Sequence, residues 1–294
     1  MHLSDSISEI QTLLLDWFDI NGRHWIPWKL NANGTLAKPG ETISPYGIWI
    51  AEVMLQQTQL PVVLPYWQNW MRNFPTLNDL AKSEEKYILL QWQGLGYYSR
   101  AKRIFQSSKI LIDLIGKNHI FDISSWPIEV SQWMLLPGVG RTTAGSIISS
   151  AFDLPAPILD GNVKRILSRL IASDEINMKA QQKLWELSLL LLSEERPRDF
   201  NQALMDLGNK VCTPNQPCCT SCPLQSFCVA YINYNPLNFP KKEMKKIISP
   251  QEIGIGLVFN KSGELLIDQR LENSSMGGMW EFPGGKKMPS ESIE

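Results

Sequence analysis

The stretch that most constrains the fold is residues 136–145, which read Leu-Pro-Gly-Val-Gly-Arg-Thr-Thr-Ala-Gly. An apolar run with helical spacing precedes it and stops at its proline, and the small residues at its end begin a second helix. Gly138 and Gly140 favour a tight turn between the two helices, because glycine has no Cβ. The stretch therefore predicts a helix-hairpin-helix over about residues 125–152.

The glycine turn also has the character of an anion-binding site. Its backbone N–H groups can approach a flat anionic surface, and the second helix adds the positive end of its dipole there. A nucleic-acid phosphate fits that description, whereas an ordinary helical hairpin with turn-forming glycines is the alternative. Asp160 favours the first interpretation, because it ends a Pro-rich apolar loop just before the basic pair Lys164 and Arg165.

Hairpin, loop and aspartate in this order resemble the helix-hairpin-helix family of DNA base-excision glycosylases. Residues 51–59, Ala-Glu-Val-Met-Leu-Gln-Gln-Thr-Gln, narrow the resemblance because they are similar to the catalytic-acid motif of adenine glycosylases of the MutY type. The resemblance implies a mostly α, two-part helical glycosylase domain. It also implies hydrolysis of the N-glycosidic bond of adenine opposite 8-oxoguanine or guanine, with double-stranded DNA as the partner and a monomeric protein.

Glu52 is the one acid in the middle of a helix, expected at residues 46–59, that is apolar on most faces. An ionised carboxylate is costly to bury, so we expect a raised pKa, as a general acid requires. A glutamate that faces solvent or pairs with a base is the alternative. By the resemblance, Glu52 protonates the adenine ring, Gln57 wedges into the duplex and Gln56 lines the same region.

Asp160 is the candidate for the second carboxylate role. Cleavage of a glycosidic bond develops an oxocarbenium ion, which a carboxylate can stabilise or attack. By the resemblance, Asn162 of the same Asp-Gly-Asn-Val-Lys-Arg motif helps to orient the sugar or a water molecule, and Lys164 contributes to DNA binding. Asp160 can equally cap the helix that begins near Val163, and both roles are compatible at different carboxylate oxygens.

Two further positions are assigned by the resemblance. Residues 91–103 combine two glycines, two tyrosines and three cations, which suit stacking on a base beside a phosphate, and a buried aromatic pair is the alternative. In the family the first tyrosine, here Tyr97, contacts the opposing 8-oxoguanine. Bifunctional endonuclease III relatives have a Schiff-base lysine where this chain has Thr142, so we expect hydrolysis without an efficient strand-cleaving lyase step.

All five cysteines lie between Cys212 and Cys228. No secretion signal is recognisable, which favours metal binding over disulfides. Cys212, Cys219, Cys222 and Cys228 have the spacing C-x6-C-x2-C-x5-C, and four thiolates suit zinc or an iron–sulfur cluster. The spacing resembles the [4Fe–4S] loop of endonuclease III and adenine glycosylases. Cys218 falls outside this pattern, and we interpret it as a non-ligand.

Composition sets outer limits on these assignments. The chain is 44% hydrophobic and 19% charged, as in soluble globular proteins, and no apolar run approaches membrane-spanning length. We therefore expect a cytoplasmic protein that associates with the nucleoid through DNA and has no membrane partner. The net charge of −1 argues against a non-specific nucleic-acid coat, so DNA binding must use local patches.

The 294 residues are long for one domain. Residues 1–232 are expected to form the glycosylase domain. Residues 233–250, with three prolines and a lysine-rich run, are expected to be a linker. Strand alternation begins near residue 251, and residues 277–285 resemble the start of a Nudix-type domain, which in adenine glycosylases recognises the 8-oxoguanine side. Residues 251–294 end before the acidic metal-binding part, so we expect a partial, α/β Nudix-like domain without nucleotide hydrolysis.

Further helices are expected at residues 7–20 and 179–192 from their amphipathic spacing. Asp206, in another such segment, either reaches the adenine pocket or faces solvent. Two other functions stay open: an endonuclease III-like pyrimidine glycosylase and lyase, and a non-catalytic iron–sulfur protein that binds DNA.

Overall fold

The computed structural model describes residues 6–116, 122–173, 177–241, 250–271, 274, 277–288 and 291. The chain divides into two compact units, Met1–Lys242 and Glu243–Glu294. Residues 242–249, which hold most of the lysine-rich run of the expected linker, lie outside the described residues.

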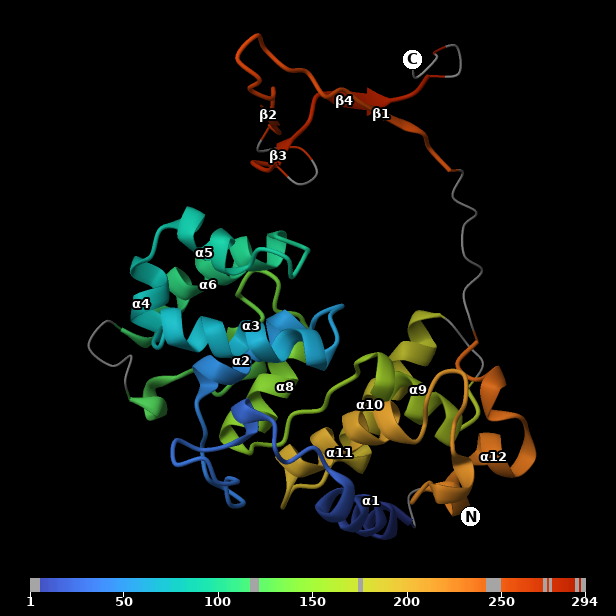
Figure 1. Cartoon of the computed structure of the whole chain (residues 1–294). Coiled ribbons are helices and arrows are strands. Elements are labelled where there is room, and N and C mark those ends of the chain that lie inside the picture. Colours follow the sequence, from blue (N-terminus) through green and yellow to red (C-terminus); the bar gives the residue numbers. More distant parts are fainter. Residues whose placement is uncertain are drawn as a thin grey trace. The chain divides into compact units, whose positions relative to one another are not determined.

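The first unit is helical (Figure 1). Its α-helices are α1 (Ile7–Asn21), α2 (Pro45–Leu55), α3 (Leu60–Asn73), α4 (Leu77–Lys82), α5 (Glu85–Gln91), α6 (Ser99–Ile115), α7 (Val130–Trp133), α8 (Arg141–Phe152), α9 (Gly161–Leu170), α10 (Met178–Leu191), α11 (Pro197–Lys210) and α12 (Val229–Asn233). Short 3₁₀ turns lie between these helices and after the last one: η2 (Pro27–Lys29), η3 (Ile123–Ser125), η4 (Cys219–Ser221), η5 (Gln225–Phe227) and η6 (Pro236–Asn238). The mostly α fold is confirmed. In the described part of the chain, no helix is both long and apolar enough to cross a membrane.

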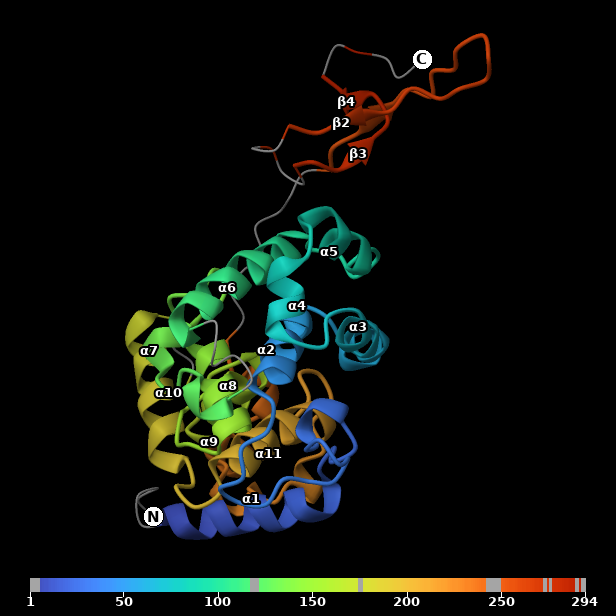
Figure 2. The same ribbon diagram turned by 90° about the vertical axis from the view of Figure 1, so that its left-hand side faces the viewer.

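Two hydrophobic cores divide this unit into two lobes. The first core gathers buried side chains from η2 and from α2 to α8. The second joins α1 to α9, α10 and α11 and extends to the cysteine-containing loop. The first helix of the chain therefore packs against helices from its far end, as Figure 2 shows for α1 beside α11.

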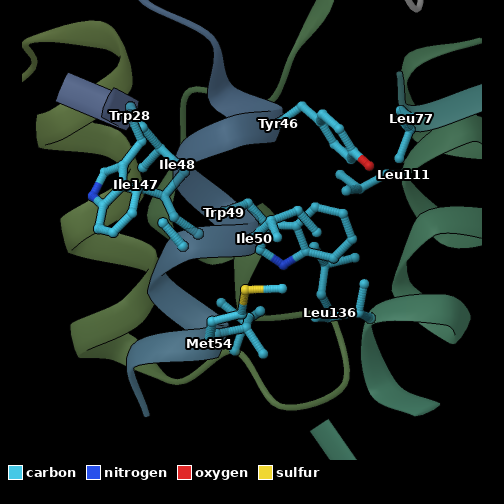
Figure 3. Packing of buried hydrophobic residues seen from close by; sticks show 14 of the residues in the cluster. Trp28, Tyr46, Ile48, Trp49, Ile50, Met54, Leu77, Leu111, Leu136 and Ile147 are labelled. Carbon is cyan, nitrogen blue, oxygen red and sulfur yellow. The ribbon is translucent and has the colours of Figure 1, made fainter. Parts of the chain in front are cut away.

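Helix α2 runs through the first core. Nine of its eleven residues are buried. Figure 3 shows Ile48, Trp49, Ile50 and Met54 packed among side chains that come from η2, α4, α6 and α8. Because apolar contacts hold this helix on most sides, its polar residue Glu52 has a fixed position.

Helix α2 ends at Leu55, before the end that we expected near residue 59. The Arg100 guanidinium is the reason: its Nη1 donates to the carbonyl oxygens of Val53 at 3.2 Å, Met54 at 2.7 Å and Gln56 at 2.5 Å. A helix leaves its last carbonyl groups without intrahelical partners, and here a buried cation satisfies them. Arg100 was expected among the DNA-facing cations, and that expectation was wrong.

The second unit holds two small antiparallel sheets, in which β1 (Ile253–Ile255) pairs with β4 (Gly284–Lys286) and β2 (Asp268–Gln269) pairs with β3 (Trp280–Glu281). The Asn260 side chain accepts the N–H groups of Ser262 and Glu264 and so stabilises a turn at these residues. The strands are shorter than the alternation predicts. Their apolar side chains remain exposed, because a sheet of two strands buries little surface.

Candidate active site

A cavity of about 810 Å³ is lined by residues from both lobes of the helical unit. Five residues singled out in the sequence line it: Glu52, Gln56, Thr142, Asp160 and Asn162. The volume is in the range of cavities that bind small molecules or a single nucleoside. Two carboxyl groups from separate stretches of the chain therefore face one space.

Glu52 reaches this cavity from the middle of α2. Burial raises the pKa of Glu52 to about 7, and the negative charge of Asp160 acts in the same direction. The Ser146 side chain and the Lys29 ammonium group counteract part of this increase. A carboxyl group that is about half protonated near neutral pH is suited to act as a general acid.

Asp160 sits at the N-terminus of α9, where a negative charge is favourable. Its Oδ1 accepts the Val163 N–H at 2.8 Å, so the expected helix cap is confirmed. Its Oδ2 accepts a hydrogen bond from Asn162 Nδ2 at 3.1 Å. The helix cap therefore uses Oδ1 and Asn162 binds Oδ2, while the residue also lines the cavity.

Asn162 connects this carboxylate to the cysteine-containing loop. Its Oδ1 accepts from Arg165 Nη2 at 2.9 Å, and Arg165 Nε donates to the Cys212 carbonyl oxygen at 2.8 Å. Arg165 Nη2 also donates to the Gly208 carbonyl oxygen at 2.7 Å. A continuous row of hydrogen bonds thus runs from Asp160 to the first cysteine.

The hairpin contacts α2 through Gln56, whose Nε2 donates to the Gly138 carbonyl oxygen at 3.2 Å and lies 3.4 Å from Thr143 Oγ1. Gly138 has a φ of +83°, which strains residues other than glycine, and a Cβ there would also come within 2.8 Å of the Arg103 side chain. Gly140 precedes α8 and faces open space. The turn between α7 and α8 has the form expected of a helix-hairpin-helix.

Gln57, Tyr97 and Lys164 are not among the residues that line the cavity. Gln57 and Tyr97 both have left-handed backbones, with φ of 58° and 48°, which is uncommon away from glycine. Tyr97 is 61% exposed, so the alternative of a buried aromatic pair is wrong for its ring. Lys164 lies half-buried on α9.

The sequence interpretation missed an ionic network that adjoins Glu52. Asp206 is fully buried and accepts from the Arg23 backbone N–H at 2.7 Å and from Arg23 Nε at 2.6 Å. Lys29 Nζ lies 3.8 Å from the same carboxylate. The alternative that Asp206 faces solvent is therefore wrong. The signal was its place three residues after the buried Ala203, on the core face of α11.

Lys29 also lines a second, smaller cavity of about 230 Å³, together with Glu52, Trp28, Ile48 and Gln202. Burial lowers the pKa of Lys29 to about 8, while Asp206 opposes this decrease. Its Nζ is buried and has no hydrogen-bond partner among the described residues. Neither Lys29 nor Gln202 stood out in the sequence, since neither belongs to a motif that the sequence interpretation recognised.

The four predicted cysteine ligands line one small cavity, which Arg169 also borders. None of the five cysteines is in a disulfide, and Cys218 is exposed. In the described ranges, no three His, Cys, Asp or Glu side chains are placed to ligate a single ion. A four-iron cluster holds its cysteine sulfurs further apart than one ion does, so four thiols around a common cavity fit a cluster.

Comparison with known proteins decides the family. Residues 50–188 match the family model of the HhH-GPD superfamily base excision DNA repair proteins. The adenine DNA glycosylase of Buchnera aphidicola subsp. Schizaphis graminum is 37% identical over 273 residues, which make up 92% of this chain and 73% of that protein. The chain belongs to the adenine DNA glycosylase family. Members of this family are typically iron–sulfur proteins.

Other members of the family are longer than this chain. The human adenine DNA glycosylase is 33% identical over 343 residues, covering 100% of this chain and 61% of the human protein. The Schizosaccharomyces pombe protein is 41% identical over 281 residues, covering 81% of this chain and 59% of that protein. The chain thus spans about three fifths of the length of these two relatives.

Solved structures show the same fold. A thermostable thymine-DNA glycosylase aligns with a TM-score of 0.65 at 24% identity, over 79% of this chain and 99% of that chain. Endonuclease III in a non-covalent complex with DNA aligns with a TM-score of 0.59 at 22% identity, over 78% and 96%. The expected helix-hairpin-helix glycosylase fold is confirmed.

Proposed function

We propose that this protein is a monofunctional adenine DNA glycosylase that removes adenine opposite 8-oxoguanine or guanine from duplex DNA and acts as a monomer. The observation that carries the proposal is that Glu52 and Asp160 line one cavity large enough for a nucleoside. The names of the relatives support adenine as the base that is removed. An enzyme that acts on a paired base must first extrude it from the stack.

Glu52 acts as the general acid. Its proton passes from the carboxyl group to a ring nitrogen of adenine, so the base leaves as a neutral molecule when the N-glycosidic bond breaks. The pKa of about 7, which burial causes, keeps a large share of the enzyme protonated at neutral pH. Gln56 and Thr142 line the same cavity and contact the extruded nucleotide.

Asp160 faces the sugar. As the glycosidic bond lengthens, positive charge develops on the deoxyribose ring, and the carboxylate stabilises this charge or attacks C1′. Water then adds at C1′ and gives a proton to the Glu52 carboxylate, which restores the acid and leaves an abasic site. Asn162 holds the Asp160 Oδ2 atom and orients the sugar or the water molecule.

The smaller cavity suits the purine ring. Trp28 and Ile48 supply apolar walls, and Lys29 and Gln202 supply polar groups. Adenine offers ring nitrogens that accept hydrogen bonds and an amino group that donates them. The Lys29 Nζ atom, which has no hydrogen-bond partner in the described part of the chain, is a donor available to such a nitrogen.

The hairpin and two exposed side chains face the duplex in this proposal. The backbone amides at Gly138 and Gly140, with the N-terminus of α8, hold a phosphate. Gln57 wedges into the stack, and Tyr97 contacts the opposing 8-oxoguanine; both are exposed at their left-handed backbone positions. Lys164 adds positive charge on α9.

We assign Cys212, Cys219, Cys222 and Cys228 as the residues that hold a [4Fe–4S] cluster. When bound, such a cluster supplies a redox-capable centre and cross-links the loop. Arg169 Nη1 donates to Cys212 Sγ at 3.2 Å, which places a cation against a ligand sulfur. These four cysteines are not among the residues that line the cavity of Glu52 and Asp160, so a cluster held by them would lie outside that cavity.

The division of the chain into two units supports a separate catalytic domain and a separate recognition segment. The boundary after Lys242 falls inside residues 233–250, which we assign as a linker between a catalytic domain, residues 1–232, and a Nudix-like segment, residues 251–294. By the resemblance, this segment serves recognition of the 8-oxoguanine side.

The test uses duplexes with a labelled adenine strand opposite 8-oxoguanine or guanine. Incubation with the protein followed by hot alkali is expected to break that strand at the adenine. Cleavage of a thymine glycol duplex without alkali would instead indicate an endonuclease III-like glycosylase and lyase. Binding to these duplexes without base removal would indicate a non-catalytic protein.

A further inference from the structure

Trp25 borders the cavity that Glu52 and Asp160 line, yet it is 60% exposed. Trp28 and Trp49, in contrast, are buried in the first core at 7% and 0% exposure. Among the interactions of the described residues, no ring contact or side-chain hydrogen bond of Trp25 is found. A large flat side chain at the entrance of a site is therefore free to contact what enters it.

The backbone around Trp25 is held on both sides. Before it, the Arg23 N–H and guanidinium bind the buried Asp206 carboxylate. After it, Ile26 and Trp28 are buried at 3% and 7% exposure. The indole therefore extends from a fixed turn, so a contact with its ring costs little ordering of the backbone.

We propose that Trp25 stacks on a base directly beside the extruded adenosine on the adenine strand. The inference rests on the proposed function. Extruding one nucleotide removes a stacking partner from each of its neighbours, and the strand must pass the rim of the cavity to place the adenosine inside. An aromatic face at that rim replaces the lost partner, and it does so for any of the four bases.

The experiment measures the dissociation constant of a duplex that carries 2′-fluoro-2′-deoxyadenosine opposite 8-oxoguanine, because the electron-withdrawing fluorine disfavours the oxocarbenium ion and blocks turnover. Trp25→Ala is expected to weaken binding about tenfold or more, whereas Trp25→Phe keeps a flat ring and stays close to the wild type. Ile20→Ala is the matched control, since Ile20 is 83% exposed at the end of α1. It is expected to bind as the wild type does.

The same measurement is then repeated with a baseless tetrahydrofuran nucleotide on the 5′ or the 3′ side of the adenosine. Removing one of the two neighbouring bases is expected to abolish the difference between wild type and Trp25→Ala. The inference is overturned if the variant binds the intact duplex as the wild type does, or if its loss persists whichever neighbour is missing. Thermal unfolding of each variant confirms its fold. Failure of the proposed function is distinct, because the wild type would then not remove adenine at all.

Discussion

Arg165 donates through Nε to the carbonyl oxygen of Cys212 at 2.8 Å, and this bond ties helix α9 to the first residue of the cysteine loop. The same guanidinium donates to Asn162 Oδ1, whose amide nitrogen in turn donates to Asp160. The position of the carboxylate in the cavity therefore depends on a loop that lies outside the cavity. A cysteine loop that loses its order is therefore expected to displace the Asp160 carboxylate through these hydrogen bonds.

Replacing Arg165 with methionine tests this dependence. The change removes the donor to Asn162 and leaves the carbonyl groups of Gly208 and Cys212 without it. We expect the single-turnover rate of adenine removal to fall about 10- to 100-fold, as for other groups that orient a site indirectly. The free energy of unfolding should fall by about 1–3 kcal/mol. Lys183→Met, which changes an exposed cation on α10, is the control, and an unchanged rate in Arg165→Met would contradict the coupling.

Glu52→Gln is expected to make the protein more stable at alkaline pH. The pKa of about 7 in the folded protein lies above the usual value of 4.5, so the wild type loses stability as pH rises through 7, when the buried carboxyl group must ionise. The difference of about 2.5 pH units corresponds to an upper limit of roughly 3 kcal/mol. Urea unfolding at pH 5 should give similar values for both proteins, and at pH 9 the glutamine variant should be more stable. A pH-independent difference would show that Glu52 is not a buried acid.

Thr142 is the residue from which we predict that the protein lacks an efficient lyase step. A hydroxyl group cannot form a Schiff base with the deoxyribose, so the wild type is expected to leave an intact strand with an abasic site until alkali is added. Thr142→Lys places an amine in the cavity, and borohydride should then trap a covalent protein–DNA complex. Thr142→Ser is the control and should trap nothing. Efficient trapping by the wild type would contradict this account.

The cysteines should separate into two groups. Cys222→Ser removes one of the four thiols around the small cavity, and we expect the purified variant to lose the visible absorbance of an iron–sulfur centre and to unfold at a lower temperature. Cys218→Ser changes an exposed thiol outside that cavity and should keep both properties. Equal iron content in the two variants would show that Cys222 is not a ligand.

The sequence was informative where one local pattern determines one local structure. The glycines of the hairpin, the cap at Asp160 and the helical spacing of α1, found at Ile7–Asn21, all follow from short-range rules. Glu52 was found because burying an ionised carboxylate in an apolar helix costs free energy, so an acid at such a position indicates a function. Its raised pKa follows from the same burial that made it conspicuous.

What the sequence did not reveal depends on contacts between distant segments. Arg100 binds carbonyl groups of α2 that lie more than forty positions earlier in the chain. The sequence does not show this contact, and we therefore interpreted the cations near the two tyrosines as DNA contacts. Arg23 and Asp206 are 183 positions apart in the sequence, and their pairing joins the first and the last part of the helical unit's chain. No periodicity in either segment indicates its partner.

The central claim is that Glu52 delivers the proton that releases adenine, and one comparison tests it most directly. The single-turnover rate of adenine removal from a duplex with 8-oxoguanine is measured for the wild type and Glu52→Gln, together with the dissociation constant of the 2′-fluoro duplex. We predict a rate at least about 100-fold lower for Glu52→Gln, with the dissociation constant nearly unchanged. A variant that removes adenine at the wild-type rate would contradict the account.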